Sequence, residues 1–229
     1  MEGNYRNTEK RGELMIPAPV VPQSFSQLGL IIPDGSGSME GPTLNGMSKA
    51  EAVGATIHGV LARFKVSSQR KNFRFGIVSF ASEGRVMMEP TAAADIDDDA
   101  SYDPRHSDGT DTFIGSGLLV ARCLAEEFLT GANREMPTTV VMLVLSDGRD
   151  REASGAGPDE TLQIAEEIKR NPAITICTAY FAQKGLFDPE AEDVLRRIAS
   201  KPATGYKSVY DAETLRSFFL SSLSAERRI

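Results

Sequence analysis

The chain has 229 residues, of which 41% are apolar and 25% are charged, so it is long enough and apolar enough to form one α/β domain with a sizeable core. Acidic residues outnumber basic ones by 32 to 25, and the resulting net charge of −7 argues against a protein that neutralises nucleic-acid phosphates. No apolar run approaches the roughly 18 residues that a membrane-spanning helix needs. We therefore expect neither a nucleic-acid nor a membrane partner.

The N-terminal segment differs in composition from the rest of the chain. Residues 1–25 are polar or rich in proline, and three prolines between Ile16 and Pro22 interrupt any regular backbone pairing. We interpret residues 1–25 as an extended, partly disordered arm, residues 26–225 as one domain and residues 226–229 as a tail. The first eleven residues lack the apolar core of a signal peptide, so we expect a cytoplasmic protein.

Strand and helix patterns alternate along the predicted domain. Apolar or alternating runs that are typical of strands lie at 28–32, 73–81, 85–88, 138–145 and 174–181, with a short edge strand ending near Val209. Apolar residues at steps of three and four predict helices over 48–64, 113–129, 158–169, 189–200 and 214–223. Residues 90–111 are interpreted as one long polar loop. The alternation predicts an α/β, Rossmann-like fold: a doubly wound, mostly parallel central sheet with helices on both faces.

The two cysteines do not point to a function. Cys123 and Cys177 each lie in an apolar segment, and the chain has no CxxC motif. We expect both thiols to be buried as small apolar side chains.

Three loops of the predicted sheet carry oxygen donors. In such sheets the functional site lies at the carboxyl ends of the strands, where the strand order reverses. The loops contain the segments 34–39 (DGSGSM), 109–112 (GTDT) and 146–148 (SDG). Two carboxylates and at least three hydroxyls form the donor shell that a hard divalent cation such as Mg²⁺ or Mn²⁺ prefers. Gly35 and Gly37 allow a tight turn, so that the hydroxyls of Ser36 and Ser38 can converge on one point.

Taken together, these loops resemble the metal-ion-dependent adhesion site of von Willebrand factor A-type domains. The segment Asp34–Met39 resembles the family's DxSxS signature, Thr112 resembles its threonine at the start of the metal-site helix, and Asp147 resembles its final aspartate. The resemblance extends over residues 27–224 and implies a compact, intracellular, bacterial type of this domain.

The resemblance also implies a function and a role for each residue. Ser36, Ser38 and Thr112 would bind the metal through their hydroxyls, and Asp34 and Asp147 would bind it directly or through water. Mg²⁺ is the first choice, with Mn²⁺ and Ca²⁺ as alternatives. One coordination position would stay open for an Asp or Glu carboxylate of a partner protein. The implied function is metal-dependent protein binding without catalysis, in a bacterial system of the stress or tellurium-resistance type.

Two local points and one alternative function stay open at this stage. Thr110 competes with Thr112 as the threonine ligand. Pro33 removes a backbone donor at the end of a central strand, so we expect the strand ladder to end early there. The alternative function is a Mg²⁺-dependent phosphohydrolase on a similar sheet. Phosphatases of the haloacid dehalogenase type need a second aspartate two residues after the first, where this chain has Ser36.

Overall fold

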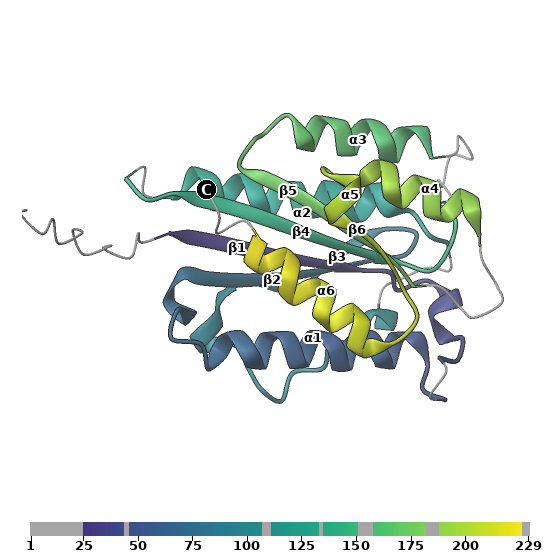
Figure 1. Cartoon of the computed structure of the whole chain (residues 1–229), viewed down its shortest axis with the longest axis horizontal. Coiled ribbons are helices and arrows are strands. Elements are labelled where there is room, and N and C mark those ends of the chain that lie inside the picture. Colours follow the sequence, from purple (N-terminus) through teal and green to yellow (C-terminus); the bar gives the residue numbers. More distant parts are fainter. Residues whose placement is uncertain are drawn as a thin grey trace, which may run out of the picture.

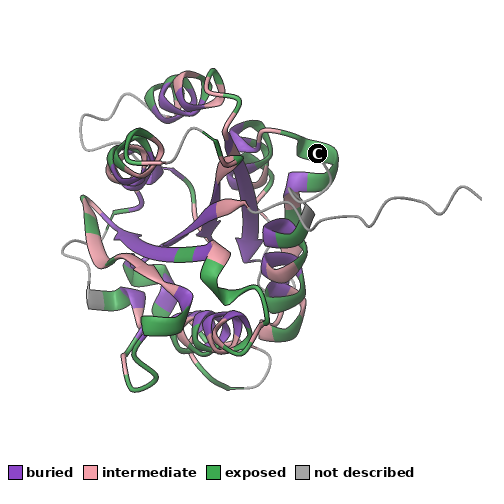
Figure 2. Ribbon diagram, turned by 90° about the vertical axis from the view of Figure 1, so that its left-hand side faces the viewer, coloured by how far each residue is buried: buried purple, intermediate pink, exposed green. Residues whose placement is uncertain are grey.

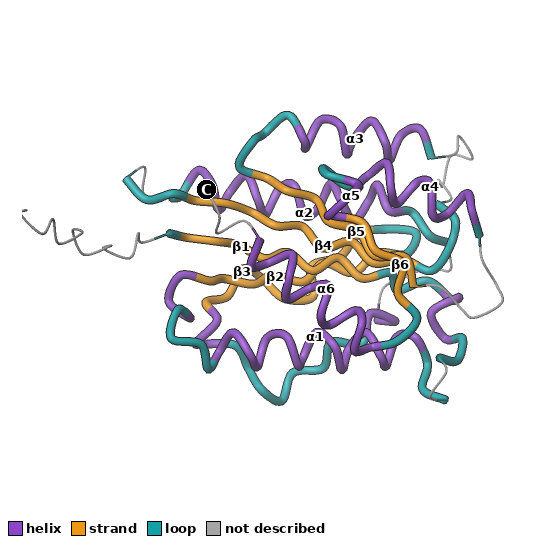
Figure 3. The backbone as a smooth tube through the Cα atoms, in the orientation of Figure 1, coloured by secondary structure: helices purple, strands orange, loops and turns teal. Residues whose placement is uncertain are grey.

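A six-stranded sheet forms the centre of the molecule (Figure 3). The structure, a computed structural model, describes residues 25–43, 46–106, 111–132, 135–150, 158–181 and 188–225. The strands are β1 (Ser26–Pro33), β2 (Phe73–Phe80), β3 (Gly84–Ala92), β4 (Thr138–Ser146), β5 (Ile174–Phe181) and β6 (Tyr206–Val209). Their order is β3-β2-β1-β4-β5-β6, and every neighbouring pair is parallel except β2 and β3. The predicted fold class is confirmed.

Helices cover both faces of this sheet (Figure 1). One face carries α1 (Lys49–Lys65) and α6 (Ala212–Ala225), and the other carries α2 (Ile114–Thr130), α3 (Asp159–Lys169) and α4 (Pro189–Ile198). The shorter elements are η1 (Gly37–Glu40), η2 (Arg70–Asn72), η3 (Ala93–Asp95), η4 (Pro104–His106) and α5 (Pro202–Gly205). The predicted long helices all form within about two residues of the expected bounds. In the part of the chain that the structure describes, no helix is both long and apolar enough to cross a membrane.

The central strands are buried on both sides, as Figure 2 shows. Successive side chains of a strand point to opposite faces of the sheet. In β4, one face carries Val141, Leu143 and Leu145, and the other carries Val140, Met142 and Val144; all six are fully buried. The first set packs toward α1 and α6 and the second toward α2 and α3. An uninterrupted apolar run is therefore what this position in the sheet requires.

Pro33 affects only one of its two neighbouring strands, which corrects the expectation that the ladder ends early. The pairing of β1 with β4 continues to Pro33 opposite Leu145. The backbone N–H of Asp34 then donates to the carbonyl of Leu145 at 2.9 Å. The pairing with β2 stops at Ile31 and resumes only at a single bridge between Asp34 and Phe80. Because donors alternate between the two sides of a strand, the missing N–H of Pro33 is lost on the β2 side alone.

The predicted long loop over 90–111 is wrong in its first part. β3 continues to Ala92 and pairs antiparallel with β2. Thr91 lies opposite Phe75 and Met88 opposite Ile77, so two residues of β3 face the single Gly76. Such a bulge is where a strand tolerates proline, and it accommodates Pro90. Residues 107–110 lie outside the described part of the chain.

One of the two cysteines does not follow the prediction. Cys177 on β5 is buried, but Cys123 on α2 is exposed. The buried face of α2 carries Ile114, Leu118 and Ala121, and Cys123 lies on the opposite side of the helix. An apolar segment was a poor guide here because a helix buries only one of its faces.

Candidate metal site

The candidate site lies between the two central strands, β1 and β4, at their carboxyl ends. The chain leaves β1 toward β2 and β3 on one side, whereas β4 leads to β5 and β6 on the other. The strand order therefore reverses between β1 and β4, which is where open α/β sheets bind ligands. Asp34 follows β1 directly, and Asp147 follows β4 directly. The fold thus brings the two predicted carboxylates to the same crevice.

The Asp34 carboxylate is completely buried and held by two hydrogen bonds. Its Oδ1 accepts the backbone N–H of Ser36 at 2.8 Å, which closes a local turn of the Asx type. Its Oδ2 accepts the hydroxyl of Ser146 at 2.5 Å. Strand β1 and the end of β4 therefore fix this side chain from two directions.

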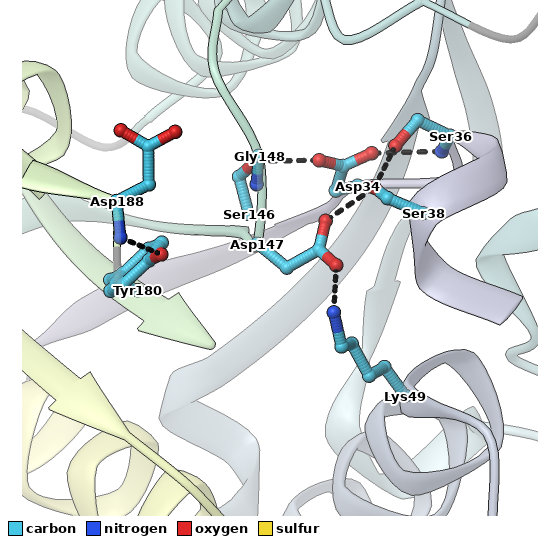
Figure 4. Close-up of polar contacts among 9 residues, drawn as sticks. All are labelled: Asp34, Ser36, Ser38, Lys49, Ser146, Asp147, Gly148, Tyr180 and Asp188. Carbon is cyan, nitrogen blue, oxygen red and sulfur yellow. Dashed lines mark hydrogen bonds and ion pairs between the residues drawn. The ribbon is translucent and has the colours of Figure 1, made fainter. Parts of the chain in front are cut away.

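The serines of the DxSxS segment connect the two aspartates (Figure 4). The hydroxyl oxygens of Ser36 and Ser38 lie 3.0 Å apart, and Ser38 Oγ donates to Asp147 Oδ1 at 2.6 Å. Ser36 is buried, whereas Ser38 is exposed. The chain of polar atoms therefore leads from the interior at Asp34 to the surface at Ser38.

Thr112 supplies a further hydroxyl beside Ser38. A β-carbon built on Gly148 would lie 3.5 Å from Thr112 Oγ1 and 3.7 Å from Ser38 Oγ, so both hydroxyls border the same small space. Thr112 is 7% exposed and precedes α2. Thr110 lies outside the described residues, so its competition with Thr112 stays untested. Of the five predicted site residues, all are described, and the structure brings all five together.

Sequence reasoning missed Lys49, the first residue of α1. Its Nζ forms an ion pair with Asp147 Oδ2, on the carboxylate oxygen that Ser38 does not use (Figure 4). The side chains are 8% and 1% exposed; Asp147 as a residue is partly exposed, and its side chain is not. The available signal was Ser48-x-x-Glu51, a capping box that places Lys49 at the start of the helix.

Two further residues that the sequence analysis left out support the site. Ser146 is the last residue of β4, and its hydroxyl donates to Asp34. Asp150 Oδ1 accepts the backbone N–H of Ile114 at 2.9 Å, which ties the loop after β4 to the start of α2 beside Thr112. A polar residue that ends an apolar strand is a usable signal for Ser146. Nothing in the sequence indicates the bond of Asp150, because its partner lies 36 residues away.

The electrostatics of the site favour a cation. Burial, together with the nearby charge of Asp147, raises the pKa of Asp34 to about 7, although hydrogen bonds from Ser146 and Ser36 act in the opposite direction. Two carboxylates that share a small, water-poor space repel each other when both are ionised. A positive ion between them would remove that repulsion.

The donor set fits a hard divalent cation. Three hydroxyls and two carboxylates are oxygen donors of the kind that Mg²⁺, Mn²⁺ and Ca²⁺ accept. Among the described residues, no group of three or more His, Cys, Asp or Glu side chains is arranged so that it could hold a metal ion. The site is therefore rich in hydroxyls, and it lacks the thiolate and imidazole ligands that typify structural zinc sites.

Comparisons with solved structures show the same fold. The structure of proximal thread matrix protein 1 from the mussel byssus with a zinc-occupied metal-ion-dependent adhesion site is 18% identical, with a TM-score of 0.59 over 89% of this chain and 46% of that one. The open conformation of the pilus adhesin SpaC from Lactobacillus rhamnosus GG is 13% identical, with a TM-score of 0.65 over 89% and 30%. The conserved hypothetical protein BatB from Bacteroides thetaiotaomicron is 15% identical, with a TM-score of 0.59 over 89% and 100%.

The share of the other protein that aligns with this chain differs among these structures. The chain spans less than half of the mussel protein and about a third of the adhesin, but all of BatB. No curated protein matches the sequence. The sequence model of the von Willebrand factor type A domain matches residues 30–223. This range holds all five predicted site residues and, apart from the start of β1 and the end of α6, the whole sheet and its long helices. The chain therefore belongs to the von Willebrand factor type A domain family.

Proposed function

We propose that the chain is a protein-interaction module that holds one divalent metal ion and uses it to bind an acidic residue of a partner protein. The observation that carries the proposal is the hydrogen-bonded series Ser36–Ser38–Asp147, which begins next to the buried Asp34. The hydroxyls of Ser38 and Thr112 border the same space beside Gly148, and Ser36 Oγ lies 3.0 Å from Ser38 Oγ. The membership of the family and the fit of the donor set support the same reading.

Each residue has a distinct task in this proposal. Ser36, Ser38 and Thr112 would contact the ion through neutral hydroxyls. Asp34 and Asp147 would contact it directly or through water and would keep the serines in place. When bound, the ion supplies a positive centre to which a carboxylate from outside can bind. Because three of the contacts are neutral, much of the ion's charge is left for that carboxylate.

The identity of the metal is part of the proposal. Mg²⁺ is the first choice, with Mn²⁺ and Ca²⁺ as alternatives, because all the donors are oxygens. The mussel protein, whose structure has zinc in this kind of site, adds Zn²⁺ to the ions worth testing. A cytoplasmic location and a role in a bacterial stress or tellurium-resistance system are further parts of the proposal, and they rest on the amino-acid sequence alone.

Calorimetric titration of metal-stripped protein tests the proposal. Mg²⁺, Mn²⁺, Ca²⁺ and Zn²⁺ are added in turn, and we expect binding of one ion per chain. Asp34→Ala and Ser38→Ala should abolish or strongly weaken this binding. Ser68→Ala is the matched control, because Ser68 is an exposed serine in the turn after α1. The proposal fails if the native protein binds none of the four ions.

Two additional measurements address the partner and the alternative function. An array of peptides that contain Asp or Glu should retain the metal-loaded protein, and the matching Asn and Gln peptides or a chelator should not. A phosphatase assay with p-nitrophenyl phosphate should show no metal-dependent hydrolysis. Hydrolysis that Asp34→Ala removes would instead favour the phosphohydrolase. That enzyme needs a second aspartate two residues after the first, and in this chain Ser36 occupies that position.

A further inference from the structure

Lys49 occupies a position that ordinary helix energetics disfavours. It is the first residue of α1, where the backbone N–H groups point outward and the helix dipole repels a cation. Its side chain is also only 8% exposed, and burial of an ammonium group is costly unless it is paired. Both costs are offset by one contact, the ion pair with Asp147. Neither the helix dipole nor burial favours a lysine here, so the stability of α1 does not explain why Lys49 occupies this position.

The surroundings hold Lys49 at this spot. The capping box between Ser48 and Glu51 fixes the start of α1. The backbone N–H of Lys49 donates to the carbonyl of Gly41 at 2.9 Å, and the N–H of Gly41 donates to the carbonyl of Ser38 at 3.1 Å. These backbone bonds tie the start of α1 to the loop that carries the serines. They place Lys49 where its side chain contacts Asp147.

The ammonium group of Lys49 supplies the positive charge next to Asp147 in the hydrogen-bonded series of the site. Asp147 has two oxygens, of which Oδ1 accepts from Ser38 and Oδ2 from Lys49. The side chain of Asp147 is 1% exposed, so solvent does little to screen its charge. A β-carbon on Gly41 would lie 3.7 Å from Lys49 Nζ, an ordinary van der Waals distance, so the end of the lysine side chain lies against the loop that follows the serines.

We propose that Lys49 is an internal cation that balances Asp147 when no metal is bound and competes with the metal for this carboxylate. The proposal rests on the proposed metal site. Lys49 therefore lowers the affinity of the site for a divalent ion and keeps the metal-free form intact. Even where the ammonium group stays in place after the ion binds, its charge repels the ion over a few ångströms. Lys49 is a residue that tunes metal affinity and is not itself a ligand.

Removal of the lysine charge should accordingly strengthen metal binding. Lys49→Met keeps a long unbranched side chain and removes the charge. A unit charge at this range shifts proton affinities by one to three orders of magnitude, so we expect Lys49→Met to bind Mg²⁺ or Mn²⁺ about tenfold tighter or more in calorimetric titration. Lys49→Gln is the second variant, in case the methionine does not fold. It can still donate a hydrogen bond to Asp147, and it should change the affinity in the same direction.

Lys65→Met is the matched control. Lys65 is the last residue of the same helix, about 24 Å away along the axis, and pairs with Asp98. Its replacement changes the net charge of the protein by the same amount as Lys49→Met. We expect it to leave metal affinity within about twofold of the native value, because charges at this distance are screened in ordinary salt.

The outcomes separate this inference from the proposed function. If the native protein binds metal and both Lys49 variants bind it equally or more weakly, the inference is overturned while the metal site stands. If only the Lys49 variants bind, the inference is supported and the native chain is not a metal-dependent module under these conditions. If neither native protein nor variants bind, both proposals fail.

Discussion

The two ends of α1 carry the same residue in opposite circumstances. At the C-terminal end, Lys65 is partly exposed, donates to the carbonyl of Ile96 and pairs with the exposed Asp98. The helix dipole favours a cation at that end. At the N-terminal end, Lys49 is buried, faces an unfavourable dipole and pairs with the buried Asp147. Lys65 is where helix stability alone would place a lysine, and Lys49 is not.

This difference shows how a functional position can be recognised without an alignment. Local propensity, charge placement and burial usually agree along a natural chain, and they tend to conflict where function imposes its own demand. Lys65 satisfies these preferences, so a structural role accounts for it. Lys49 violates two of them at the edge of the sheet where the DxSxS loop lies. The comparison therefore points to the candidate site independently of its motif.

Replacement of the acidic partner of each lysine should give the largest difference in stability between the two ends of α1. Asp147→Asn leaves Lys49 buried and unpaired, and we expect the metal-free protein to lose about 3 to 5 kcal/mol of unfolding free energy. Asp98→Asn breaks an exposed pair and should cost less than about 1 kcal/mol. Urea unfolding of both variants in the presence of a chelator measures the difference. Equal losses would show that the Lys49 pair is no more important than a surface contact.

Replacement of the other site carboxylate, Asp34, should raise the stability of the metal-free protein, because no lysine among the described residues forms an ion pair with it. Burial and the charge of Asp147 raise the pKa of Asp34 from 3.8 to about 7 in the folded protein. Between these pH values the folded state binds more protons than the unfolded chain, so stability of the metal-free protein falls as the pH rises through this window. Asp34→Asn removes this dependence and should stabilise the metal-free protein at pH 8 by on the order of 2 to 4 kcal/mol.

Unfolding curves of both proteins at pH 4 and pH 8, with chelator present, test this expectation. The gap between native protein and Asp34→Asn should be small at pH 4 and large at pH 8. The same variant should lose metal binding, so that stability and function move in opposite directions. A gap that does not widen with pH would mean that Asp34 ionises freely in the folded state.

Replacement of the lysines themselves should give a smaller difference in stability. Lys49→Met leaves the Asp147 carboxylate buried without its cation and should destabilise the metal-free protein by about 2 kcal/mol. Lys65→Met should cost less than about 1 kcal/mol. Thermal unfolding with chelator measures both. Addition of Asp147→Asn to Lys49→Met should cost less than the two single changes summed, because the two groups share one interaction.

The sequence was sufficient for the fold because each strand and long helix has a strong local pattern. The apolar run of β4 and the three-and-four spacing of α1 reflect burial on two faces and on one face. The errors arose where a contact between distant segments decides the outcome. Whether Pro33 ends a ladder depends on the side to which its missing donor points, and the bulge at Pro90 depends on pairing with β2.

The convergence of the site residues could also be predicted from short local patterns. The donor residues lie in three short motifs at strand or helix ends, so topology alone predicts that they meet. Lys49 was not predictable, because it is the bridge between Pro42 and Ser48, with the backbone bonds of Gly41 to Ser38 and Lys49, that places the start of α1 beside Ser38. Periodicity describes which face of a helix is buried, but it does not say what the first residue of that helix touches.

A substitution at Gly148 tests whether the metal ion needs the space beside this residue, whereas a substitution at Lys49 tests the effect of charge on metal affinity. A methyl group on Gly148 would touch the hydroxyls of both Thr112 and Ser38, in the space that the metal ion would share. The only described residue with a left-handed backbone is Gly46, so Gly148→Ala needs no strained conformation and should change stability by less than about 0.5 kcal/mol. We expect metal affinity to fall by about tenfold, which corresponds to the loss of about 1.4 kcal/mol.

Gly37→Ala is the control for this substitution. Gly37 lies in the same loop as the serines, but its backbone is not left-handed, so the turn does not require the glycine that the sequence suggested. A methyl group there would meet no atom within 4 Å. Its metal affinity should match that of the native protein in the same calorimetric titration. Gly148→Ala and Lys49→Met should therefore shift the affinity in opposite directions from the same site, one by occupying space and the other by removing charge. Shifts in the same direction would mean that at least one of these side chains does not border the ion, and the position assigned to the metal between Ser38, Thr112 and Asp147 would be wrong.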